Sequence, residues 1–87
     1  MKGIDILLIE DNLADIFLTT EAFEGSRIVN KITAIRDGEK AIEFFESLKD
    51  NEKIPNLVLL DINLPRISGY EVLVYIKNHE RFQSIPV

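Results

Sequence analysis

The chain has 87 residues, which suffices for one small domain. It carries 15 acidic and 10 basic residues, so it lacks the basic excess that nucleic-acid-binding domains use. It contains no cysteine, which excludes disulfides, thiolate metal sites and cysteine nucleophiles. No segment approaches the roughly 18 apolar residues of a membrane span. We therefore expect a cytoplasmic protein with neither nucleic acid nor membrane as a partner.

Three short segments predict β-strands. Residues 4–9 and 57–60 are almost continuously apolar, a pattern typical of parallel strands buried on both faces. Residues 28–35 mix apolar residues with polar ones such as Lys31, so this strand is expected at an edge of the sheet. A fourth strand is expected to begin at residues 85–87.

Amphipathic segments that follow the strands predict three helices. The first is capped by Asp11 or Asn12 and ends at Gly25-Ser26, the second follows a turn at Asp37-Gly38, and the third ends near Asn78-His79. Alternating strands and helices favour an α/β fold with a parallel sheet. The apolar stripes of the three helices are Ala14, Phe17, Leu18 and Ala22; Ala41, Phe44, Phe45 and Leu48; and Val72, Leu73 and Ile76.

Acidic residues end two of the predicted strands. Glu10-Asp11 follows the first strand and Asp61 follows the third. The carboxyl ends of parallel strands share one edge, where neighbours lie about 4.8 Å apart, so three carboxylates should converge there. Taken singly, the pair is more typical of a helix cap and Asp61 of a turn, but their joint occurrence favours a site.

Three close carboxylates raise one another's pKa, and a hard divalent cation relieves this repulsion. We therefore interpret Glu10 and Asp11 as ligands that bind Mg²⁺ either directly or through water. Asp61 would share the metal and offer its other oxygen as the nucleophile for a phosphoryl group.

The sequence resembles, over its whole length, the receiver domain of two-component response regulators, the CheY-like family. The resemblance implies a flavodoxin-like doubly wound parallel sheet with strand order 2-1-3-(4), an Mg²⁺ cofactor and a histidine kinase as phosphoryl donor. The matching positions are Glu10-Asp11 for the metal-binding acids, Asp61 for the phosphorylated aspartate, Asn63 for a metal-binding backbone carbonyl, the turn Asp37-Gly38, and Pro65 and Gly69 in the loop after the phosphorylation site.

Two segments, Glu10–Asp15 and Leu64-Pro65-Arg66, look most like the single-domain regulators that pair with phytochrome-type histidine kinases. The family pattern has five strand–helix units, whereas this sequence holds three and the opening of a fourth. Residues 1–87 are therefore interpreted as the N-terminal part of one receiver domain. The proposed metal ligands are all present, whereas the family's later hydroxyl residue and lysine, which the switch requires, are not.

The incomplete sheet has a packing consequence. Its open edge invites pairing with another chain, so we expect a homodimer, and one face of the first helix should be exposed.

Two other functions fit parts of the pattern. A magnesium-dependent phosphohydrolase also uses an aspartate nucleophile, but it would need a second aspartate where Asn63 stands. A purely structural half-domain would bind no metal. We expect a signalling module rather than an enzyme.

Overall fold

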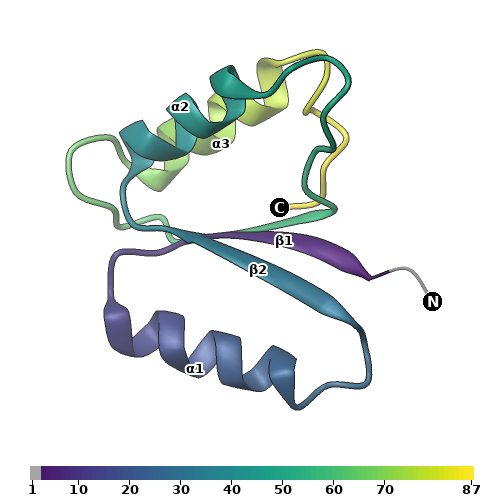
Figure 1. Ribbon diagram of the computed structural model, residues 1–87. Coiled ribbons are helices and arrows are strands. Elements are labelled where there is room, and N and C mark those ends of the chain that lie inside the picture. The colour runs from purple at the N-terminus through teal and green to yellow at the C-terminus, as the bar shows by residue number, and fades with distance from the viewer. Residues whose placement is uncertain (1–2) are drawn as a thin grey trace.

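The computed structural model describes residues 3–87 and alternates strands with helices along the chain (Figure 1). The strands are paired in parallel in the order β2-β1-β3, so the expected order and the edge position of the second strand are confirmed. The elements are β1 (Ile4–Ile9), α1 (Leu13–Glu24), β2 (Asn30–Ile35), α2 (Gly38–Ser47), β3 (Leu57–Leu60) and α3 (Gly69–Asn78).

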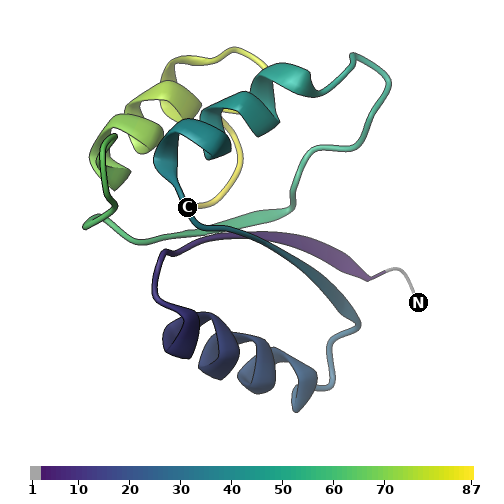
Figure 2. The same cartoon turned by 60° about the vertical axis from the view of Figure 1, so that its left-hand side comes forward.

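The helices form one layer on each side of the sheet, as the flavodoxin-like arrangement requires. α1 lies on one side, while α2 and α3 lie together on the other (Figures 1 and 2). Each helix begins at a polar cap: Asn12 accepts from the backbone N–H of Asp15, Asp37 accepts from that of Glu39, and Ser68 from that of Glu71.

The hydrophobic core lies between the sheet and the α2/α3 layer. Alternate residues of β1 point into it, because side chains along a strand alternate between its two faces. Its fully buried members include Leu7 and Ile9 of β1, Val58 of β3, Phe45 of α2, Val72 and Ile76 of α3, and Phe82.

The other layer is packed much less tightly. α1 has no buried residue, and the side chains of Leu13, Phe17 and Leu18 are 61–64% exposed. The predicted helix is present, and the expected exposure of one of its faces is confirmed. The predicted apolar stripe lies on that exposed face, since Ala14, Phe17, Leu18 and Ala22 are all exposed, whereas Ile16 and Phe23 are half-buried.

Two predicted strand limits were wrong. Ile28 and Val29 lie outside β2, because the Asn30 side chain donates hydrogen bonds to the carbonyls of Phe23 (3.0 Å) and Ile28 (2.8 Å) and holds the preceding turn. Residues 85–87 form no strand. The carbonyl of Pro86 accepts one bond from the N–H of Val58 (2.9 Å), but proline has no N–H with which to continue a ladder.

Candidate metal and phosphorylation site

The register of the sheet brings the ends of β1 and β3 together. Ile9 is paired with Leu60. The ladder continues one step further, because the Asp61 N–H donates to the Ile9 carbonyl (3.0 Å) and the Glu10 N–H donates to the Ile35 carbonyl (2.9 Å). Glu10 and Asp61 therefore leave the sheet side by side.

Three carboxylates converge at this edge, as predicted from the strand ends. Glu10, Asp11 and Asp61 each place one carboxylate oxygen within 4.8 Å of the others, and all three residues are half-buried. Their role as metal ligands stays a prediction, but the geometry on which it depends is present.

Backbone N–H groups orient two of these carboxylates. Glu10 Oε2 accepts from the N–H of Asn12 (3.2 Å), and Asp61 Oδ1 accepts from the N–H of Asn63 (3.0 Å). The second bond engages one of the two carboxylate oxygens of Asp61. The sequence allowed either Asp11 or Asn12 as the N-cap of α1. Asn12 is the residue that caps the helix, so the Asp11 side chain is not needed for capping.

The cluster carries electrostatic repulsion that a cation would relieve. Burial raises the pKa of the Glu10 carboxyl above its usual value, and the nearby Asp61 and Asp15 carboxylates raise this pKa further, against a partly opposing hydrogen bond from Asn12. A hollow of about 350 Å³, lined in part by Thr19 of α1, opens directly beside Glu10 and Asp61. Mg²⁺ prefers oxygen ligands, and the hollow leaves space for an ion beside them. The three carboxylates therefore fit a hard divalent cation.

The loop after Asp61 is fixed by a close backbone contact. The N–H of Gly69 donates to the Ile62 carbonyl (2.9 Å), and a Cβ on Gly69 would lie 2.6 Å from the Ile62 Cα and collide with the Asp61 carbonyl. Only glycine therefore fits at the first position of α3 while Asp61 keeps its place. The buried side chain of Leu64 anchors the middle of the same loop.

The sequence analysis missed a residue that positions Asp11. Arg36 directly follows β2, and its guanidinium donates to the Asp11 carbonyl from Nε (3.3 Å) and Nη2 (3.0 Å). The available signal was its place, since a residue that follows a parallel strand lies on the same edge as the acids. Asn63, the fourth predicted ligand, is exposed beside Asp61, and the role of its carbonyl stays a prediction.

Comparisons with known proteins agree with this architecture. Residues 6–87 match the response regulator receiver domain family. The probable methanogenesis regulatory protein FilR2 of Methanothrix harundinacea is 41% identical over 83 residues, and response regulator Rcp1 of Synechocystis sp. is 42% identical over 84 residues. Both alignments cover 94% of this chain but only 54% and 57% of the relatives, so the chain spans a little over half of their length.

Solved structures of response regulators also superpose closely on this chain. The Mn²⁺-bound form of response regulator Rcp1 superposes with a TM-score of 0.89 at 40% identity, covering 98% of this chain and 63% of the other. The phosphorylated cyanobacterial phytochrome response regulator RcpA superposes with a TM-score of 0.89 at 39% identity, covering 99% of this chain and 63% of the other. The chain belongs to the response regulator receiver domain family and is close to response regulator Rcp1 and to the phytochrome response regulator RcpA.

Proposed function

We propose that this chain is the phosphoacceptor part of a two-component phosphorelay and takes a phosphoryl group from a histidine kinase onto Asp61. The convergence of Glu10, Asp11 and Asp61 at one sheet edge carries the proposal. Two relatives support it, since one was solved in a phosphorylated form and the other with Mn²⁺ bound. RcpA is a phytochrome response regulator, which favours a phytochrome-type kinase as the donor.

One hydrogen bond supports different roles for the two oxygens of Asp61. Oδ1 accepts from the Asn63 N–H, and we propose Oδ2 as the nucleophile. As Oδ2 forms a bond to phosphorus, the P–N bond to the donor histidine breaks, and the released imidazole keeps the electron pair and takes up a proton.

A bound Mg²⁺ would be held by Glu10, Asp11, Asp61 and the Asn63 carbonyl, and it supplies positive charge to offset that of the transferring phosphoryl group. The chain's own contribution is positioning. Arg36 fixes the backbone of Asp11, and Gly69 allows α3 to begin against the backbone of Asp61.

A phosphoryl mimic tests this assignment. Beryllofluoride with Mg²⁺ should bind the wild-type chain, as seen by ¹⁹F NMR, and Asp61→Asn should abolish the bound signal because it removes the attacking carboxylate. Asp50→Asn, which removes an exposed carboxylate outside the cluster, should bind like the wild type. Binding that persisted in Asp61→Asn would defeat the proposal.

We propose a signalling role rather than hydrolysis. The residue two positions after Asp61 is Asn63, whose amide cannot act as the acid–base group of an aspartate-based phosphohydrolase. Steady turnover of p-nitrophenyl phosphate would favour the enzyme instead. An Mg²⁺ titration without measurable binding would favour a structural half-domain.

We further propose that the chain acts in the cytoplasm and forms a homodimer through the sheet edge next to β3. Within residues 3–87, Pro86 supplies one hydrogen bond to that edge and no further strand covers it. In the same part of the chain, no helix is long and apolar enough to cross a membrane. Light scattering at micromolar concentration should give the dimer mass, and a monomer would remove the dimer proposal.

A further inference from the structure

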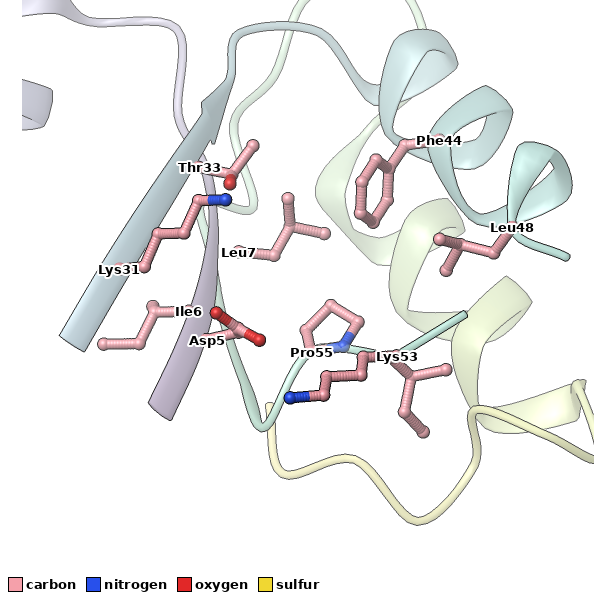
Figure 3. Close-up of a pocket in the computed structure, with 10 residues that line it drawn as sticks. Asp5, Ile6, Leu7, Lys31, Thr33, Phe44, Leu48, Lys53 and Pro55 are labelled. Atoms are coloured by element: carbon pink, nitrogen blue, oxygen red, sulfur yellow. The ribbon is translucent and has the colours of Figure 1, made fainter. Parts of the chain in front are cut away.

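A second hollow lies at the end of the sheet opposite to the acidic cluster. It has a volume of about 200 Å³ and is formed by the first half of β1, β2, α2 and the segment before β3 (Figure 3). Asp5 lines it and precedes Glu10 by five residues on β1, which separates the two sites by about 16 Å along the strand.

One wall of this hollow is apolar. Figure 3 shows Phe44 and Leu48 of α2 pointing toward Leu7 of β1 and toward Pro55. Phe44, Leu48 and the adjacent Ile54 are only half-buried, so an apolar group placed among them would remove further apolar surface from water.

The rim of the hollow is cationic, although the chain as a whole carries a net charge of -5. The exposed Lys31 of β2 and Lys53 both line it, together with the half-buried Asp5. Among residues 3–87 the one ion pair joins Arg66 to Asp37, so neither lysine is engaged in one. Two lysines and one carboxylate leave a single positive charge at the rim.

Wall and rim together favour one kind of ligand. A further hollow of about 680 Å³ adjoins this one and shares Asp5, Lys31, Lys53 and Ile54 with it, so the chemistry of the lining, and not its volume, selects the ligand. A free phosphate would leave the apolar wall uncovered, and its larger negative charge would be repelled by the Asp5 carboxylate more strongly than that of a monocarboxylate. We propose that this hollow binds a small apolar monocarboxylate, with its ring or branched chain against Phe44 and Leu48 and its carboxylate at Lys31 and Lys53.

This site is independent of the phosphoacceptor chemistry. Its lining includes none of the acids at the other end of β1 and no residue after Pro55. β2 is also at the opposite edge of the sheet from β3, so a strand added beside β3 leaves the hollow open.

An NMR titration with 3-phenylpropionate at constant ionic strength tests the proposal. We expect saturable amide shifts that map to Lys31, Thr33, Phe44 and Ile54 and leave Glu10 and Asp61 unmoved. Because an exposed ion pair contributes about 0.2–1 kcal/mol, Lys31→Gln and Lys53→Gln should each weaken binding about 1.4- to five-fold. Lys40→Gln, which removes an exposed charge from α2 outside the hollow, should bind like the wild type.

The neutral amide, 3-phenylpropionamide, separates the charge from the apolar body. It should bind at the same residues but at least two-fold more weakly than the acid. Equal binding of the amide, shifts that do not saturate, or shifts centred on the acidic cluster would each overturn the proposal. The three lysine variants alter only exposed side chains, so their folded spectra serve as the internal check.

Discussion

The two faces of the sheet are covered in different ways. On one face, α2 and α3 bury Phe45, Val72 and Ile76 to 1% exposure or less, whereas on the other face α1 leaves Phe17 and Leu18 more than 60% exposed. We infer that the α2/α3 layer supplies most of the stability of the chain. The acidic cluster lies at the carboxyl edge of the sheet between the layers, and the hollow beside it is lined by Thr19 of the loosely packed α1.

The largest expected effect comes from matched phenylalanine truncations in the two layers. Phe45→Ala should lower the free energy of unfolding by about 3–5 kcal/mol, because it opens a cavity in the core. Phe17→Ala should change it by no more than about 0.5 kcal/mol, because that ring is already exposed. Urea unfolding followed by circular dichroism measures both, and equal losses would contradict the comparison.

A matched pair of glycine substitutions gives the next largest difference. Gly69→Ala should destabilise the fold by about 1–3 kcal/mol, because the new methyl group collides with the backbone of Asp61 and Ile62. Gly25→Ala, at the end of α1, should stabilise it by about 0.4–1 kcal/mol, because its backbone is right-handed and its nearest neighbour would lie 3.7 Å away. Thermal unfolding of both variants provides the test, and a harmless Gly69→Ala would refute the close contact.

Removing one negative charge from the acidic cluster should stabilise the fold, by less than the core truncation destabilises it. Because the pKa of Glu10 is raised in the folded chain, its contribution favours folding at low pH and is lost as pH rises above the unfolded value of 4.5 through the folded value. At pH 7 without metal, Glu10→Gln should therefore raise the melting temperature by about 2–4 °C, after allowance for solvent screening.

When Mg²⁺ is added, Glu10→Gln should melt at a lower temperature than the wild type. The ion should stabilise the wild type more than Glu10→Gln, since the variant has lost one proposed ligand. Glu21→Gln, on the exposed surface of α1, should show neither effect. Parallel melts with Mg²⁺ and with a chelator decide the matter, and identical behaviour of the two variants would argue against a cation site.

The smallest expected effect concerns Tyr75 in the tightly packed layer. Burial and the nearby Glu46 carboxylate raise the pKa of Tyr75 above 10.0, so its contribution to stability is complete below pH 10 and is lost as pH rises through the folded value. Tyr75→Phe should remove this loss of stability at high pH. The free energies of unfolding of the variant and the wild type should then differ by less than about 1 kcal/mol. Tyr70→Phe, at a 64% exposed position, should follow the wild type in the same high-pH urea titrations.

The sequence predicted the parts of the fold that depend on local pattern. The continuous apolar runs of β1 and β3 gave their limits correctly, and the acids that follow them converge because parallel strands end on one edge. The predicted start of β2 was wrong, because the Asn30 side chain holds the backbone of Ile28 in the preceding turn despite the high strand propensity of isoleucine. Such a competing hydrogen bond is invisible in an apolar pattern.

Other features required the folded chain. The contact of Gly69 with the Asp61 carbonyl joins positions eight residues apart across a loop, and the guanidinium of Arg36 reaches the Asp11 carbonyl from another strand. The hollow beside Lys31 and Lys53 depends on the packing of α2 over β1. The sequence pattern could place Arg36 on the acidic edge of the sheet, but it does not specify any of these contacts.

Because the backbone of Gly69 lies so close to that of Asp61, a substitution at position 69 would displace Asp61. Any residue with a side chain at position 69 must push the peptide that carries the proposed nucleophile, however well that residue suits the start of a helix. A full set of substitutions at this single position would therefore yield a series of graded displacements of Asp61. Acceptor activity plotted along that series would reveal how precisely the reacting oxygen has to be placed.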